Sequence, residues 1–178
     1  MGFSVSKSLH KVGTFTGVDG RMEPVSRGQP YKVVVDYAHT PDALRNALCM
    51  LREFTQGKLH LVFGCGGDRD RGKRLEMTRV ACAGADEVWA TSDNPRTESQ
   101  QSIFGDMRKG LSKRAKVNFV EDRRQAISLA MDASGGEDCV LIAGKGHETF
   151  QEVQYTAIPF DDRLVAGELL DAKLLGAA

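Results

Sequence analysis

The stretch Tyr31-Lys32-Val33-Val34-Val35-Asp36-Tyr37-Ala38-His39-Thr40-Pro41 shows the pattern that decides the fold: a short apolar run, then a cluster of polar residues. Four more runs of this kind, each followed by charged or glycine residues, occupy residues 59–63, 87–90, 117–120 and 140–143. Alternation of such runs with helix-like segments predicts an α/β fold with a mostly parallel sheet. Because parallel strands end at one edge, the five clusters are expected at that edge, where open α/β sheets bind ligands.

The segments between the runs have helical character. In the first of them, Pro41 suits the first helical position, and Leu44, Ala47, Leu48 and Leu51 form one apolar face. The helices are predicted at residues 41–54, 75–85, 100–111, 124–131 and 162–175. The strand order does not follow from the sequence.

Length and composition exclude several classes of protein. The chain has 178 residues and a formal net charge of zero, which suits one domain with a full core and gives no bulk attraction to nucleic acid. No apolar run approaches the ~20 residues of a membrane span. The four cysteines form no Cys-x-x-Cys pair, and no four-ligand zinc pattern is present. We expect a reducing, cytoplasmic setting and no metal site.

Residues 67–73 match the Gly-x-x-x-x-Gly-Lys spacing of a phosphate-binding loop. The residue after Lys73 is Arg74, whereas Mg²⁺ ligation requires Ser or Thr at that position. The carboxylates of Asp68 and Asp70 would also face the phosphates. We therefore reject a phosphate loop. A flexible glycine turn stays open as an alternative, but a binding loop is favoured, because Arg can grip a carboxylate with two parallel hydrogen bonds.

The clusters at residues 93–96 and 144–148 each have a plain structural interpretation. Asn94-Pro95 with Thr97 can be a turn and a helix cap, the second cluster can be a glycine turn, and His39 taken alone can be a structural histidine. Their expected convergence on one edge favours a ligand site instead. Arginine and backbone amides suit a carboxylate, and a glutamate suits an ammonium group, so the clusters together predict a zwitterionic ligand.

Taken together, these clusters resemble the C-terminal domain of the Mur ligases. The resemblance is strongest to the subgroup that adds meso-diaminopimelate to UDP-N-acetylmuramoyl-L-alanyl-D-glutamate, and it covers nearly the whole chain. It implies a Rossmann-like, mostly parallel sheet of about six strands flanked by helices. The segments that carry it are Gly20-Arg21-Met22-Glu23, Asp36-Tyr37-Ala38-His39-Thr40-Pro41, Gly64-Cys65-Gly66-Gly67-Asp68-Arg69-Asp70, Asp93-Asn94-Pro95-Arg96 and Gly144-Lys145-Gly146-His147-Glu148.

The resemblance also implies site residues. The residues expected at diaminopimelate are Arg69, Asp93, Asn94, Arg96, Gly144 and Glu148. Those expected at the nucleotide are Arg21, Asp36, His39 and Thr40. Lys73 and Lys145 receive no role. In the family, ATP with Mg²⁺ phosphorylates the substrate carboxylate, and the incoming amine attacks the acyl phosphate.

The resemblance further implies what this chain lacks. The family's central domain carries the true phosphate loop and a carbamylated lysine, and neither is present here. No catalytic residue is therefore expected in this chain, and ATP, Mg²⁺ and the UDP-MurNAc-dipeptide would be bound mainly by other domains. Residues 1–30 are expected to be the end of the central domain and a hinge, with residues 1–12 resembling its last helix. Residues 31–178 are expected to form the amino-acid-binding domain.

Two other functions stay open. A folylpolyglutamate or cyanophycin synthetase shares the Asp-x-Ala-His-like motif, but the clusters at residues 93–96 and 144–148 argue against it. A non-catalytic amino-acid-binding module would use the same sheet edge without chemistry.

Overall fold

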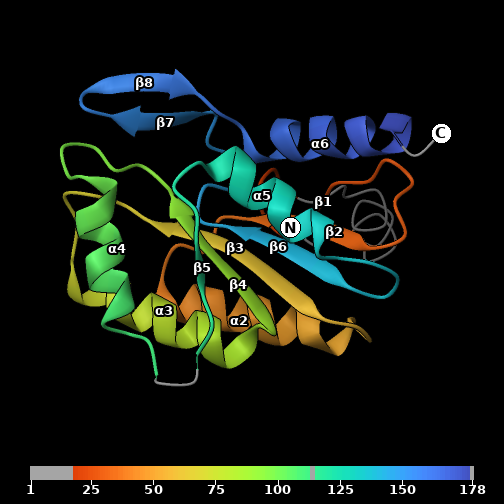
Figure 1. The fold of residues 1–178 in the computed structure, drawn as a ribbon, viewed down its shortest axis with the longest axis horizontal. Helices are drawn as coiled ribbons and strands as arrows, with labels where there is room; N and C mark the ends of the chain where they lie inside the picture. Colours follow the sequence, from red (N-terminus) through yellow and green to blue (C-terminus); the bar gives the residue numbers. More distant parts are fainter. Residues whose placement is uncertain (1–17, 113–114, 177–178) are drawn as a thin grey trace, which may run out of the picture.

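A central sheet with helices on both faces makes up the computed structural model, which describes residues 18–112 and 115–176 (Figure 1). The helix predicted at residues 1–12 lies outside the described residues. The sheet has six strands, so the expected architecture is confirmed. In spatial order the strands are β1 (Glu23–Pro24), β2 (Lys32–Asp36), β6 (Cys139–Ala143), β3 (Leu59–Cys65), β4 (Glu87–Ser92) and β5 (Asn118–Phe119).

Every neighbouring pair in this sheet is parallel except β1 with β2. The strand β6 lies between β2 and β3, so the chain returns to the middle of the sheet after β5. The short β1 shows that part of the connector before residue 31 pairs with the domain's own sheet.

The helices form one layer on each face of the sheet (Figure 1). One layer contains α2 (Pro41–Glu53), α3 (Gly72–Gly84) and α4 (Gln100–Arg108). The other contains α5 (Arg123–Asp132) and α6 (Asp162–Gly176). The strands are apolar on both faces: in β6, Leu141 packs toward the first layer, while Val140 and Ile142 pack toward the second. Burial of each such side chain contributes about 1.5–3 kcal/mol.

The start of α2 agrees with its prediction. Thr40 caps the helix, with its Oγ1 accepting a hydrogen bond from the backbone N of Ala43 at 3.2 Å, and Pro41 follows in the first turn. Proline is tolerated there because the first backbone N–H groups of a helix have no partner within the helix.

Two helix boundaries differ from the prediction by three residues, and one expected strand is shorter than its apolar run. Helix α3 begins at Gly72 rather than at residue 75, because Asp70 Oδ1 accepts a hydrogen bond from the backbone N of Gly72 at 2.8 Å. Helix α4 ends at Arg108 rather than at residue 111, where tighter turn bonds such as Gly110 N to Met107 O replace the helical pattern. The fourth apolar run pairs over only two residues, Asn118–Phe119, at the edge of the sheet.

The hairpin of β7 (Phe150–Val153) and β8 (Thr156–Pro159) was not predicted. It extends away from the main sheet beside the start of α6 (Figure 1). Its two-residue turn, Gln154-Tyr155, has φ angles of 44° and 63°, the left-handed geometry that matches the twist of a hairpin. Asn-Gly or Asp-Gly would have signalled such a turn, and Gln-Tyr does not.

The order of the strands creates a crevice at their carboxyl ends. Strands β3 and β6 are neighbours, yet the helices that follow them, α3 and α6, lie on opposite faces of the sheet. The connections therefore diverge above this pair of strands, which is where open α/β sheets bind ligands.

Candidate functional site

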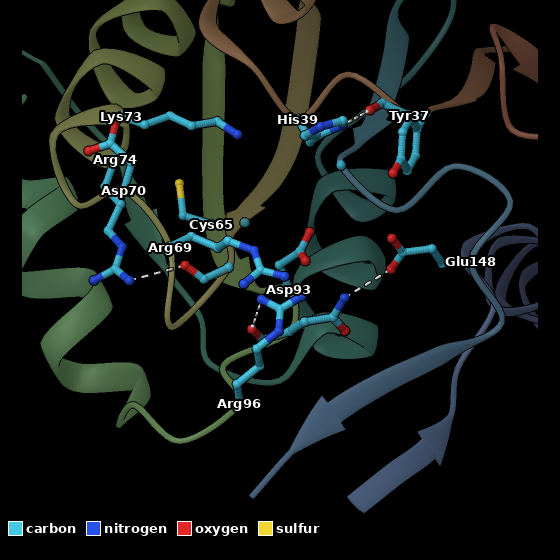
Figure 2. A pocket seen from close by; sticks show the side chains of 14 residues that line it. Tyr37, His39, Cys65, Arg69, Asp70, Lys73, Arg74, Asp93, Arg96 and Glu148 are labelled. Atoms are coloured by element: carbon cyan, nitrogen blue, oxygen red, sulfur yellow. Dashed lines mark hydrogen bonds between the residues drawn. The ribbon is translucent and has the colours of Figure 1, made fainter. Parts of the chain in front are cut away.

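A pocket of about 300 Å³ lies at the carboxyl edge of the sheet, above β2, β6, β3 and β4. We call it the edge pocket. It is lined by Tyr37, His39, Gly64, Cys65, Gly66, Arg69, Asp70, Lys73, Arg74, Asp93, Asn94, Arg96, Gly144 and Glu148. Figure 2 shows Arg69, Asp93 and Glu148 directed toward its centre. Four of the five polar clusters contribute to the lining, and the cluster after β5 does not.

The six residues predicted to hold the amino acid all line the edge pocket. Of the four predicted nucleotide residues, only His39 does. Asp36 is buried and accepts hydrogen bonds from the backbone N atoms of Met22 and Ala38, both at 2.8 Å. Thr40 caps α2, and the guanidinium of Arg21 lies 4.6 Å from the centre of the Tyr37 ring. These three residues therefore support the neighbouring wall of the pocket.

Arg96 is held by the hairpin that the sequence did not reveal. Its backbone N donates to Glu152 O at 2.9 Å, and its backbone O accepts from Gln154 N at 2.8 Å. Its Nη1 donates to Gly67 O at 2.8 Å, and its Nε lies 2.9 Å from Glu152 Oε2. Nη2 donates no hydrogen bond to any described residue. The guanidinium is thus aimed before a ligand arrives and keeps donors available, which suits recognition of a carboxylate.

The loops after β3 and β4 contact each other through backbone. Gly67 N donates to Asn94 O at 2.9 Å, and a Cβ atom at Gly67 would lie 1.9 Å from Pro95 O. Only glycine allows this approach. Asp68 accepts hydrogen bonds from the hydroxyl and backbone N of Thr97, and these bonds lower the pKa of the Asp68 carboxyl.

Asn94, Lys145 and Glu148 form a hydrogen-bonded set that we call the polar triad. Lys145 Nζ donates to Asn94 Oδ1 at 3.1 Å and to Glu148 Oε2 at 2.9 Å. Asn94 Nδ2 donates to the same Glu148 oxygen at 2.9 Å. Burial raises the pKa of Glu148, but the bonds from Lys145 and Asn94 outweigh it and hold the pKa below its usual value. Glu148 is therefore an anion at the pocket wall at neutral pH.

The pocket contains no activated thiol. Burial, supported by the nearby charge of Asp93, raises the pKa of the Cys65 thiol to about 12. The thiolate is the nucleophilic form of cysteine, so Cys65 acts here as a small neutral wall residue. The pocket lining therefore offers a ligand both guanidinium groups, including those of Arg69 and Arg96, and carboxylates, including that of Glu148.

Comparison with known proteins identifies the domain. The family model described as "Mur ligase, glutamate ligase domain" matches residues 20–146. The chain belongs to this family. It is 48% identical over 174 residues to the UDP-N-acetylmuramoyl-L-alanyl-D-glutamate–2,6-diaminopimelate ligase of Prochlorococcus marinus. That alignment covers 97% of this chain and 35% of the relative, so the chain spans about a third of the length of this curated relative.

Solved structures agree. A structure of a UDP-N-acetylmuramoyl-L-alanyl-D-glutamate–2,6-diaminopimelate ligase matches with a TM-score of 0.84 and 43% identity, over 97% of this chain and 35% of that one. The predicted resemblance to Mur ligases is confirmed. Folylpolyglutamate synthase of Thermotoga maritima matches with a TM-score of 0.58 at 19% identity, over 81% of this chain and 31% of that one, which shows a shared fold alone.

At the wall of the pocket of this Mur ligase domain, Arg74 is the centre of an ion-pair cluster that sequence reasoning missed. Arg74 is 1% exposed and pairs with Glu98 at 2.6 Å and with Asp106 at 3.0 Å. It also donates to Gly66 O at 3.1 Å, so it supports the loop after β3. Hydrogen bonds from Arg74 lower the pKa of Glu98 to about 2. No periodic pattern marks this cluster in the sequence, because Arg74, Glu98 and Asp106 come from separate segments.

Glu98→Gln is expected to lower the free energy of unfolding at pH 7 by about 1–3 kcal/mol. The pKa of Glu98 falls from its ordinary 4.5 to about 2 on folding, so its carboxylate stabilises the fold above about pH 4.5. That contribution is lost as the pH falls toward 2. The variant should therefore show a weaker loss of stability between pH 5 and pH 2 than the unmodified chain. Urea unfolding at several pH values measures both effects.

The matched control is Glu87→Gln. Glu87 pairs with the exposed Lys58 at the amino ends of β3 and β4, which is the end of the sheet away from the edge pocket. Exposed ion pairs contribute about 0–1 kcal/mol to the free energy of unfolding. Equal effects of the two substitutions would show that the Arg74 cluster does not stabilise the domain.

The described residues hold no group of three or more His, Cys, Asp or Glu side chains arranged to bind a metal ion. Among the same residues, no helix has the length and apolar character needed to cross a membrane.

Proposed function

We propose that the edge pocket binds meso-diaminopimelate as the incoming amine of an ATP-dependent amide ligase, which adds it to UDP-MurNAc-L-Ala-D-Glu in peptidoglycan synthesis. The observation that carries this proposal is that the guanidinium of Arg96 and the carboxylate of Glu148 line the same pocket. Meso-diaminopimelate carries two carboxylates and two ammonium groups, so it needs both kinds of partner. The identity to diaminopimelate ligases supports the same substrate.

In this proposal Arg96 and Arg69 meet carboxylate groups, and Glu148 meets one ammonium group. Asp93 shapes the loop: a Cβ atom at Gly144 would lie 2.8 Å from Asp93 Oδ2, so Gly144 lets the two strand ends approach. Holding one amino-acid end against these groups leaves the other end free to react, and such positioning lowers the entropy cost of joining two substrates.

The nucleotide contacts also belong to the proposal. Of the four residues, His39 lines the edge pocket, whereas Asp36 ends β2, Thr40 caps α2 and Arg21 contacts the Tyr37 ring beside it. Residues 1–30 would then be the end of a central domain and a hinge, and residues 31–178 the amino-acid-binding domain. ATP, Mg²⁺ and the UDP-MurNAc-dipeptide would be held mainly by the rest of a longer protein. The described residues do not fit a metal ion, so we derive no step through Mg²⁺ here.

The four cysteines are free thiols, three of them at least partly buried. Unpaired cysteines of this kind suit a reducing compartment, so we propose that the protein works in the cytoplasm.

Calorimetric titration of the 178-residue chain with meso-diaminopimelate and with L-lysine tests the function. We expect diaminopimelate to bind at least tenfold more tightly than lysine, because lysine lacks the second carboxylate and each charged hydrogen-bond pair contributes about 1.5–3 kcal/mol. Equal affinities, or no heat with either compound, would contradict the proposed substrate. A non-catalytic binding module would give the same titration but no ligase activity in the longer protein.

A further inference from the structure

Lys145 is a fully buried ammonium group without a place among the proposed amino-acid contacts. Its side chain is 0% exposed, and both of its described hydrogen bonds go to residues of the edge pocket, Asn94 and Glu148. A buried lysine is costly unless it is paired. Its position inside the polar triad therefore suggests a task at the site.

Lys145 and the backbone of Glu152 together fix the orientation of the Asn94 amide. Asn94 Oδ1 accepts from Lys145 Nζ at 3.1 Å and from the backbone N of Glu152 at 3.0 Å. Both partners can only donate, because an ammonium and a backbone N–H have no acceptor. A reversed amide would place its NH₂ group against two donors. The Nδ2 group of Asn94 must then face Glu148 and the pocket.

Lys145 also contacts Glu148. Its Oε2 accepts from both Lys145 and Asn94, at 2.9 Å in each case. Its Oε1 accepts no hydrogen bond from a described residue, while the residue lines the pocket. One oxygen is thus held by the protein and the other is available to a ligand donor.

We infer that Lys145 is a positioning residue that sets the polarity of the edge pocket, making Asn94 a donor toward the ligand and Glu148 an acceptor. The carboxylate of the bound amino acid then lies toward Asn94 and Arg96, and its ammonium lies toward Glu148. This inference rests on the proposed function for its ligand, and on the contacts of the polar triad for its geometry.

Two substitutions separate the effect of the Lys145 charge from the effect of its hydrogen bonds to Asn94 and Glu148. Lys145→Met removes both the charge and the donors. Lys145→Gln keeps an amide that can donate to Asn94 and Glu148 but removes the charge. The matched control is Lys58→Met, which removes the lysine of the exposed Lys58–Glu87 pair far from the pocket.

The first measurement needs no ligand. Carboxyl carbon NMR of the chain follows the titration of Glu148. The pKa of Glu148 should rise in both Lys145 variants, because burial persists and the Lys145 charge is gone, while the more weakly acting charge of Arg96 remains. The Asn94 side-chain amide signals should move strongly in Lys145→Met and less in Lys145→Gln. Lys58→Met should leave both sets of signals in place.

The second measurement is calorimetry with meso-diaminopimelate from pH 5 to pH 8. Lys145→Met should bind at least tenfold more weakly at pH 6, and its affinity should increase with pH, because Glu148 must be ionised to accept from an ammonium. The unmodified chain should show little change over this range. The double variant Lys145→Met/Glu148→Gln should bind weakly and lose the pH dependence.

The outcomes are distinct. Folded Lys145 variants with an unmoved Glu148 titration and unchanged affinity would overturn the inference and leave the proposed function standing. Unfolding of both variants would make Lys145 a purely structural residue and would also overturn it. If the unmodified chain binds no diaminopimelate while Glu148 titrates as described, the proposed function fails and the positioning role of Lys145 stands.

Discussion

The 178-residue chain by itself is expected to show no ATP hydrolysis and no amide-bond formation above background. Phosphoryl transfer requires backbone amides, a lysine and a Mg²⁺-binding Ser or Thr around the phosphates. The only segment with similar spacing, residues 67–73, is organised against that task. The backbone N of Asp68 donates to Glu98 Oε1 at 2.7 Å, and the backbone N of Gly72 donates to Asp70 Oδ1 at 2.8 Å. The carboxylates of Glu98 and Asp70 therefore already accept hydrogen bonds from backbone N–H groups that a phosphate would need.

Coupled assays of ADP and phosphate release, with UDP-MurNAc-L-Ala-D-Glu and meso-diaminopimelate present, measure this directly. A full-length diaminopimelate ligase such as the Prochlorococcus marinus relative serves as the positive control. Sustained turnover by the purified chain would show that its own residues assemble a phosphate site, and would contradict our rejection of a phosphate loop.

Arg96→Ala is expected to weaken meso-diaminopimelate binding by about tenfold to over a hundredfold, the equivalent of ~1.5–3 kcal/mol for a charged hydrogen-bond pair. Lysine lacks the second carboxylate, so its binding should change far less, and the preference for diaminopimelate should narrow. Arg96 is held by Gly67 O, the Glu152 carboxylate and the β7 backbone, so its loss removes a preorganised contact. Calorimetry on the chain, and kcat/KM ratios in a longer ligase, measure the effect.

Arg163→Ala is the matched control, because Arg163 is also a partly buried arginine, paired with Asp161 away from the lining of the edge pocket. Its substitution should leave the preference between the two amino acids unchanged. An unaltered preference in Arg96→Ala would mean that another residue, with Arg69 the first to test, selects the substrate.

The sequence by itself determined the parts of this protein that depend on local chemistry. The spacing of apolar residues and the local composition predicted the parallel strands, the helices between them and the polar edge of the sheet. Buried strands and amphipathic helices can be predicted in this way because each depends on residues that are close together in the sequence. The start of the first helix at Pro41 was equally local. The clusters at residues 93–96 and 144–148 carried enough local information to reveal the family, and the assignments of their side chains to ligand groups stay predictions.

The tertiary structure alone decided how these parts meet. The position of β6 between β2 and β3 depends on pairing between residues about a hundred positions apart, which no local pattern encodes. The hairpin that holds Arg96 has a Gln-Tyr turn, a half-buried strand β7 and an exposed strand β8, so it shows neither a turn signal nor a buried apolar run. Lys145 received no role from the sequence, and the structure shows that its side chain is fully buried. Its burial is compensated by Asn94, 51 positions earlier in the chain, and by Glu148, and only folding brings these three together.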